Sequence, residues 1–269
     1  MLVGHQDAFN AIQTLMTPPF TRRVFCVVAP EGVGRQHLLR EVFRTKSSCD
    51  DDLRVISDPY VSVDTIRAQE VWLSYKPVQS SFKLLVVVVQ GISDEAQNSL
   101  LKLFEDTPEY LIIAIVVDSV STLLPTLASR LMLLHLRHLS RKDSEAIWLS
   151  QGVEPSVYSQ LWTLAPGQPG LALKRYSRKY LPTLQSLSKL LRESPSPDDF
   201  LRWSLQLTEW DTSDLVDFWL WMAPKIVLSY QDFSCREVRF ALRVSEILLE
   251  HPKFDPVLGI PALWCEVVN

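Results

Sequence analysis

Residues 24–36 read VFCVVAPEGVGRQ, and this stretch decides the fold. Its first five residues are apolar without polar alternation, which predicts a strand buried on both faces of a sheet. A glycine-containing turn follows, and apolar residues within 38–43 continue as a helix. A strand, a glycine turn and a helix in this order form the frame of a phosphate-binding loop. Backbone N–H groups and the helix N-terminus face an anion there.

The phosphate loop, residues 29–36, lacks the side chains of a working site. Such a site needs GxxxxGK[ST], in which the lysine reaches the β- and γ-phosphates and the hydroxyl holds Mg²⁺. Here Ala29 replaces the first glycine, Arg35 the lysine and Gln36 the hydroxyl residue, while Gly32 and Gly34 remain. We interpret Gly32, Gly34 and Arg35 as a degenerate, inactive nucleotide-binding loop. From the loop alone, an ordinary strand–helix turn with two glycines is the alternative.

A second requirement is an acidic residue at the end of a neighbouring strand, where it holds the Mg²⁺. The expected strand over residues 83–89 is followed by Gln90, which stands where the acidic residue is required. The nearest acids, Asp94 and Glu95, fall in the next expected helix. The loop and the strand end are therefore altered together.

The residues around the loop repeat the alternation of strands and helices. Residues 83–89, 111–117 and 131–136 predict further buried strands. Helices are expected over residues 4–16, 63–73 and 94–106, the last capped by Ser93, with a helical turn over residues 121–129 and irregular structure over residues 45–60. Buried strands that alternate with helices predict a parallel, doubly wound α/β sheet. From residue 140 onward only helical patterns occur.

Composition excludes several classes of protein. The net charge of −4 gives no overall attraction to nucleic acid or to an anionic membrane. No basic segment precedes an apolar run at the N-terminus, and the apolar runs, such as residues 84–89, are too short to cross a bilayer. We therefore expect a cytoplasmic protein without a membrane partner.

The four cysteines, Cys26, Cys49, Cys235 and Cys265, include no CxxC pair. Zinc-ligand spacing is absent, so no zinc or other metal site is expected.

Five short motifs resemble the bacterial DNA polymerase III clamp-loader AAA+ family, in the family's order. Residues 94–109, DEAQNSLLKLFEDTPE, resemble A-x-N-A-L-L-K-x-L-E-E-P-P-E, and residues 123–130, LLPTLASR, resemble L-L-P-T-I-x-S-R-C. Residues 3–6 resemble the V-G-Q opening, residues 63–67 resemble V-D-x-I-R, and residues 167–173 resemble the lid segment G-S-P-G-x-A-L. The resemblance covers about residues 3–173, and the remaining third matches only in helical character and length.

Within this family the chain looks like the delta-prime type of subunit, which does not hydrolyse ATP. The hydrolysing gamma/tau subunits have an intact lysine, an acidic pair on the second strand and a lid arginine, where this chain has Gly170. Two departures from the family occur. The four-cysteine zinc module is missing, since residues 44–58 hold only Cys49, and Leu131 replaces the cysteine of the S-R-C motif.

The resemblance assigns Arg130 as an arginine finger, placed against the γ-phosphate of a neighbouring subunit. A finger supplied in trans is worth about 10³–10⁵ in rate. A surface arginine at a helix end is the alternative when the residue is considered alone. Glu105 and Asp106 could suggest a catalytic pair, but their position before Pro108 favours a solvated helix end.

We expect an AAA+ core over residues 1–138, a helical lid over residues 139–180 and an all-α collar domain over residues 181–269. The last segment carries 8 basic and 13 acidic side chains, which argues against a main role in gripping DNA. By resemblance, the partners are gamma/tau and delta subunits, and through the complex the sliding clamp and primer–template DNA.

No resident cofactor is expected, although residual ATP or ADP binding is compatible with the loop. Two other functions stay open. One is an active AAA+ ATPase with an atypical arginine loop, and the other is a stand-alone DNA-binding adaptor, for which a coherent basic face would be needed.

Overall fold

The computed structural model describes residues 3–20, 22–47, 49–58, 60–192, 196–207, 210, 212–229, 236–250, 259–260 and 263. The chain divides into two compact units, residues 1–173 and 174–269. This division does not separate residues 139–180 from the rest, so our three-domain boundaries stay a prediction. Cys235, Trp264 and Cys265 lie outside the described residues.

The first unit is built on a five-stranded sheet in the order β2-β4-β6-β1-β7, with every neighbouring pair parallel. Its strands are β1 (Val24–Val28), β2 (Leu53–Ile56), β4 (Lys83–Val89), β6 (Leu111–Val117) and β7 (Met132–His135). Strand β1 lies between β6 and β7, where Val27 pairs with Val116 and Leu134. A separate two-stranded sheet joins β3 (Tyr60–Val61) to β5 (Gly91–Ile92). The predicted parallel, doubly wound sheet is confirmed.

Strand β2 corrects our expectation of irregular structure over residues 45–60. It pairs in parallel with β4, which is its one sheet neighbour among the residues that the structure describes. Its sequence LRVI alternates, because Leu53 and Val55 are half-buried while Arg54 is exposed. A short edge strand that includes a charged residue lacks the continuous apolar run that marks the central strands, so the sequence pattern missed it.

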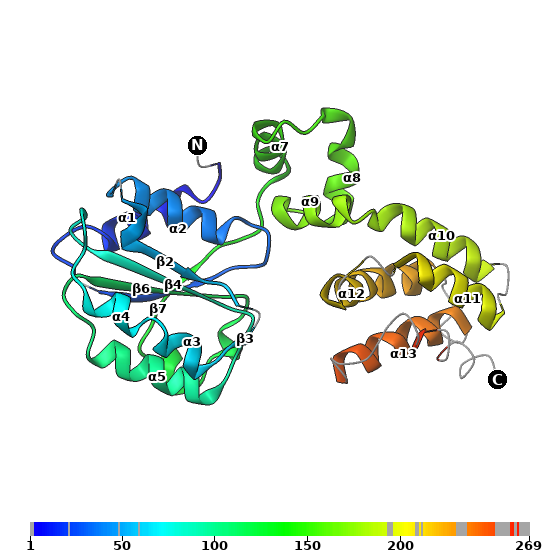
Figure 1. Cartoon of the computed structure of the whole chain (residues 1–269). Coiled ribbons are helices and arrows are strands. Elements are labelled where there is room, and N and C mark those ends of the chain that lie inside the picture. The colour runs from blue at the N-terminus through cyan, green and yellow to red at the C-terminus, as the bar shows by residue number, and fades with distance from the viewer. Residues whose placement is uncertain are drawn as a thin grey trace. The chain divides into compact units, whose positions relative to one another are not determined.

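Helices cover both faces of this sheet, as Figure 1 shows for α1 and α2 on one face and α3, α4 and α5 on the other. The bounds are α1 (Gln6–Leu15), α2 (Arg35–Arg44), α3 (Val63–Arg67), α4 (Glu70–Ser74), α5 (Asp94–Glu105) and α6 (Pro125–Ala128), with short 3₁₀ turns η1 (Asp50–Asp52) and η2 (Val120–Thr122). Side chains alternate along a strand. Phe25 and Val27 therefore pack in the core under α1 and α2, whereas Cys26 packs in the core under α3 to α5.

Two details refine the expected helices of this unit. The helix expected over residues 63–73 is interrupted and forms α3 and α4. The cap of α5 is confirmed, because the Ser93 Oγ accepts the backbone N–H of Ala96 at 3.1 Å.

A small helical layer follows the sheet. It contains α7 (Arg141–Ser150), η3 (Pro155–Val157), α8 (Tyr158–Leu164) and the first residues of α9 (Pro169–Ser177). Trp148, Leu161 and Leu171 are buried together there. The Trp148 Nε1–H also donates to the Pro169 carbonyl at 3.2 Å, which ties α7 to the start of α9.

The second unit is helical in its described parts. Its elements are α10 (Tyr180–Arg192), α11 (Pro197–Ser204), η4 (Leu205–Leu207), α12 (Thr212–Ser229) and α13 (Arg236–Glu250). Buried aromatic rings link the helices, since Trp219 contacts Trp203 and Phe240 edge-on. The tryptophans predicted as core or helix–helix packing have this role at Trp203 and Trp219. None of the described helices combines the length and apolar character needed to span a membrane.

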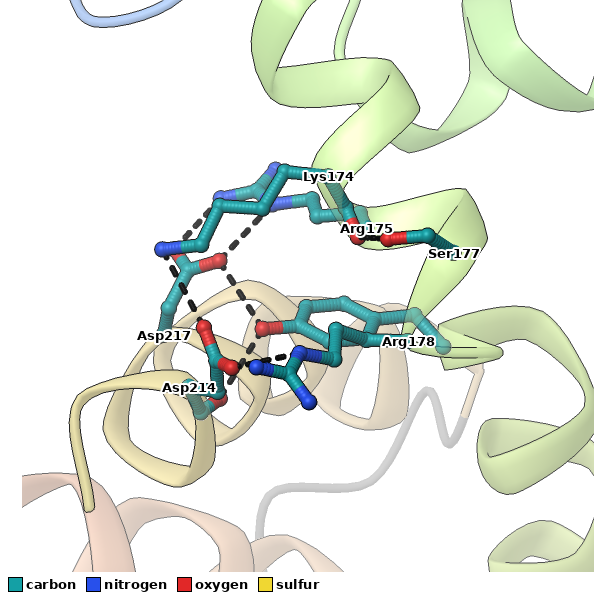
Figure 2. Close-up of polar contacts among 7 residues, drawn as sticks. Lys174, Arg175, Ser177, Arg178, Asp214 and Asp217 are labelled. Atoms are coloured by element: carbon teal, nitrogen blue, oxygen red, sulfur yellow. Dashed lines mark hydrogen bonds and ion pairs between the residues drawn. The ribbon is translucent and has the colours of Figure 1, made fainter. Parts of the chain in front are cut away.

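A charged cluster joins the C-terminal turn of α9 to the N-terminal turns of α12 (Figure 2). The Asp214 side chain is 1% exposed. Its Oδ1 lies 3.1 Å from the Lys174 Nζ, and its Oδ2 lies 2.7 Å from the Arg178 Nε. Asp217 accepts two hydrogen bonds from Arg175, at 3.0 and 2.7 Å. Acids at a helix N-terminus and cations at a helix C-terminus also complement the helix dipoles.

Candidate functional site

The phosphate loop lies at the carboxyl edge of the sheet, between β1 and α2. Gly32 and Gly34 have φ angles of 80° and 92°, a region that glycine adopts without steric cost. A cleft of about 600 Å³ opens beside the loop. Its lining includes His5, Gly32, Gly34, Arg35, Gln90 and Gly170. The three predicted loop residues therefore come together at one cleft.

The guanidinium of Arg35 is buried and is bonded to other groups of this chain. The side chain is 7% exposed and pairs with Asp118, and its Nη1 also donates to the Ala29 carbonyl at 2.8 Å. Burial lowers the pKa of Arg35, and the nearby Glu31 carboxylate opposes that shift. An arginine stays protonated even so. The cation that replaces the phosphate-binding lysine is thus held by protein oxygens at the ends of β1 and β6.

Asp118 is the site residue that sequence reasoning missed. It follows the last residue of β6 directly, and β6 pairs with β1 in register up to Val28 and Val117. The carboxyl ends of adjacent parallel strands lie at the same edge of a sheet, so an acid after β6 lies beside the loop after β1. An acid that directly follows a buried strand was the signal available in the sequence.

The rest of the cleft offers little for a metal–phosphate complex. Gln36 and Gln90 stand in its lining where a hydroxyl and an acid are needed. Burial lowers the pKa of His5, while a hydrogen bond with the Val33 backbone and the Asp143 carboxylate act to raise that pKa. Among the residues that the structure describes, no group of three or more histidine, cysteine, aspartate or glutamate side chains could hold a metal ion.

The start of α9 closes one side of the cleft. The Gly170 N–H donates to the Gly32 carbonyl at 3.0 Å. A Cβ on Gly170 would lie 3.2 Å from that oxygen, a tight contact. The position that the resemblance gives to a lid arginine is therefore occupied by closely packed backbone.

Arg130 lies at the end of α6 and is absent from the lining of the cleft. Its side chain is 49% exposed. The Nη1 donates to the Thr126 carbonyl at 2.9 Å, and the Nη2 lies 3.8 Å from the Glu105 Oε1. Glu105 is also exposed, as expected for a solvated helix end. The guanidinium is therefore held loosely at the surface, with solvent on one side.

The strand order and the loop after β1 define the class of this protein. A five-stranded parallel sheet in the order β2-β4-β6-β1-β7, flanked by helices and followed by a helical region, is an AAA+-like P-loop fold.

Residues 8–140 match the family described as "DNA polymerase III, delta subunit". This match confirms the resemblance of this part of the chain to the DNA polymerase III clamp-loader proteins. A search of curated protein sequences gives no match.

One solved structure supports the fold, and two further structures are similar over a smaller part of the chain. A DNA polymerase III gamma subunit-related protein from Thermotoga maritima is similar over 97% of this chain and 99% of its own, with a TM-score of 0.60 and 17% identity. A RuvB mutant from Thermotoga maritima covers 69% of this chain and 65% of its own, with a TM-score of 0.45 and 17% identity. Domain III of DnaA from the same organism covers 71% and 87%, with a TM-score of 0.44 and 16% identity. At these identities the likeness concerns the fold alone.

Proposed function

We propose that this chain is a delta-prime-type subunit of a bacterial DNA polymerase III clamp loader. It does not hydrolyse ATP itself, and it presents Arg130 to the ATP site of a gamma/tau neighbour. Together with a delta subunit it helps to open the sliding clamp and place it on primed DNA. The observation that carries the proposal is the contrast between the buried, paired Arg35 and the exposed Arg130.

The chain's own loop lacks what phosphoryl transfer requires. Catalysis of this reaction depends on cations that neutralise charge on the transferred phosphoryl group. Arg35 is engaged with Asp118 and Ala29, and the Mg²⁺ ligands are replaced by Gln36 and Gln90. A subunit built this way has no catalytic centre of its own, and we expect neither zinc nor a resident nucleotide.

Arg130 has the properties that a finger acting in trans needs. An exposed ion pair such as Arg130–Glu105 contributes only about 0.2–1 kcal/mol, so it holds the guanidinium without preventing its transfer to a stronger ligand. A γ-phosphate of a neighbouring subunit is such a ligand, because guanidinium–phosphate contacts are charge-assisted and bidentate.

The remaining parts are assigned by resemblance. Residues 139–180 form the lid and residues 181–269 the collar domain that joins the other subunits. The similarity to the Thermotoga maritima gamma subunit-related protein along nearly the full length of both chains supports this arrangement. The cytoplasm is the compartment that such a replication subunit requires.

The proposal is tested with a reconstituted clamp loader that contains gamma/tau, delta and this chain. We expect Arg130→Ala to leave assembly intact and to slow ATP turnover at the adjacent site by about 10³-fold or more. Arg141→Ala is the matched control, because Arg141 is also exposed and also pairs with a glutamate, Glu145. Unchanged ATP turnover in the complex with Arg130→Ala would contradict the assignment of Arg130 as an arginine finger.

A simpler measurement distinguishes the proposed function from its alternative, an active ATPase whose phosphate loop has Arg35 in place of the lysine. The purified chain is tested alone for ATP binding by calorimetry and for phosphate release. We expect no turnover. Magnesium-dependent hydrolysis that disappears in Arg35→Ala would favour the rival function instead.

A further inference from the structure

Gln97 is a buried polar side chain with a specific partner. It lies on α5, is 3% exposed, and its Oε1 accepts the backbone N–H of Leu124 at 2.6 Å. Leu124 immediately precedes α6, the one-turn helix that ends beside Arg130. A side-chain amide in a hydrophobic interior is costly unless its hydrogen bonds are made, so this contact fixes the start of α6 to α5.

A continuous series of backbone hydrogen bonds leads from Leu124 to Arg130. The Leu124 carbonyl accepts the N–H of Ala128 at 2.9 Å, and the Arg130 N–H donates to the Leu127 carbonyl at 3.1 Å. Leu127 is fully buried in the core that includes Ala96 of α5. A helix of one turn has no stability of its own. Its orientation, and with it the direction of Arg130, therefore depends on anchors outside the turn.

We propose that Gln97 is a positioning residue for Arg130. This inference rests on the proposed function of Arg130 as a finger in trans. Gln97 holds the first N–H of the Leu124–Arg130 segment, the buried side chain of Leu127 holds its middle, and the guanidinium projects from its end. Glu105 also contacts Arg130, but from an exposed position and at 3.8 Å. The buried anchor, rather than the exposed ion pair, sets the geometry of the finger.

The test uses ATP turnover in the reconstituted complex. In Gln97→Leu the side chain keeps a similar volume but loses the acceptor. We expect kcat of the neighbouring site to fall about 10-fold or more while the KM for ATP stays unchanged, since a shift near 1 Å in a catalytic group costs up to about 10²-fold. Gln97→Glu keeps an acceptor oxygen and restores most of the rate. Glu145→Gln, which removes the exposed ion pair with Arg141, is the control and leaves the rate within about 2-fold.

A double variant separates positioning from general damage. If Gln97 acts through Arg130, adding Gln97→Leu to Arg130→Ala produces no further loss. An equal additional loss in that background, a rise in KM, or an unchanged rate in the single variant would overturn the inference. Gln97→Met replaces Gln97→Leu if the latter does not assemble.

Hydrogen exchange of the isolated chain distinguishes failure of this inference from failure of the proposed function. The Leu124 amide is expected to exchange at least about 10-fold faster in Gln97→Leu than in the wild type and to be slow again in Gln97→Glu. If Arg130→Ala leaves turnover unchanged, the proposed function is wrong, and Gln97 then positions no finger. If Arg130→Ala slows turnover but Leu124 exchange is the same in all variants, the anchor alone is wrong.

Discussion

The backbone N–H of Gly170 donates to the carbonyl oxygen of Gly32 at 3.0 Å. The first turn of α9 therefore lies directly on the phosphate loop. A Cβ built on Gly32 would lie 2.5 Å from the backbone nitrogen of Leu171. Glycine at position 32 is thus required twice, by its φ angle and by the helix that packs against it.

We predict that Gly32→Ala destabilises the first unit by about 2–5 kcal/mol. A left-handed backbone costs about 1–2 kcal/mol for a residue with a Cβ, and overpacking against the Leu171 backbone adds about 1–3 kcal/mol. The free energy of unfolding is measured by urea denaturation, with hydrogen exchange in α9 as a local readout.

Gly34→Ala is the matched control for this contact. Gly34 also has a positive φ, but its missing Cβ would meet no atom within 4 Å. Its replacement should therefore cost only the backbone term, about 1–2 kcal/mol. If both variants lose the same stability, the contact between the loop and α9 contributes nothing.

We predict that Asp118→Ala lowers the free energy of unfolding by about 1–2 kcal/mol. The change leaves the buried Arg35 guanidinium with its hydrogen bond to the Ala29 carbonyl, and hydrogen bonds to charged groups contribute about 1.5–3 kcal/mol before solvent screening. Asp118 is 56% exposed, which places the expected loss at the lower end. Asp118→Asn, which keeps an oxygen acceptor, should lose less; a loss as large as in Asp118→Ala would contradict the pairing.

The central strands and the phosphate loop could be predicted from the sequence because burial on both sides leaves a continuous apolar run. Residues 84–89 and 111–117 are such runs, and they lie in β4 and β6 respectively. Strand β2 could not be predicted in this way. Its four residues are the half-buried Leu53 and Val55, the exposed Arg54 and the buried Ile56, and so short a pattern also occurs in loops.

Within the candidate site, the loop residues were predictable and their partners were not. The GxG turn identifies Gly32 and Gly34 locally, because the motif is contiguous. Asp118 and Gln97 contact residues 83 and 27 positions away along the chain, Arg35 and Leu124 respectively. An acid that follows a buried strand marks Asp118 as a candidate, but its contact with Arg35 depends on strand order, and the contact of Gln97 with Leu124 depends on helix docking.

We predict that Asp52 is a structural anchor of the first unit. This fully buried carboxylate accepts hydrogen bonds from the backbone N–H groups of Val78, Gln79 and Ser80, at 2.7, 3.1 and 3.0 Å, and from the Ser80 hydroxyl at 2.7 Å. Asp52→Ala should cost about 2–4 kcal/mol, because several donors lose their charged acceptor. Urea denaturation at neutral pH measures the loss, and the exposed Asp51→Asn serves as the control.

The same carboxylate makes a pH dependence testable. Burial acts to raise the pKa of Asp52, but the hydrogen bonds from Val78, Ser80 and Gln79 outweigh burial and hold that pKa below its ordinary value. Because the folded-state pKa is the lower one, its contribution is present above the unfolded-state pKa of about 3.9 and is lost as pH falls through the folded value. The stability difference between wild type and Asp52→Asn should therefore shrink on acidification below about pH 4. A constant difference across that range would contradict the assignment.

We predict that Asp214→Asn destabilises the second unit by about 1–3 kcal/mol. Figure 2 shows the Asp214 carboxylate between Lys174 and Arg178, and this carboxylate is 1% exposed. Removing one partner of a buried pair is costly, although Lys174 and Arg178 are 43% and 40% exposed and regain part of the loss from water. Glu246→Gln removes an ion pair whose two side chains are 41% and 54% exposed, and it should cost less than about 0.5 kcal/mol. Hydrogen exchange in α12 measures both variants, and equal protection in the two would show that the buried cluster has no special role in holding α9 to α12.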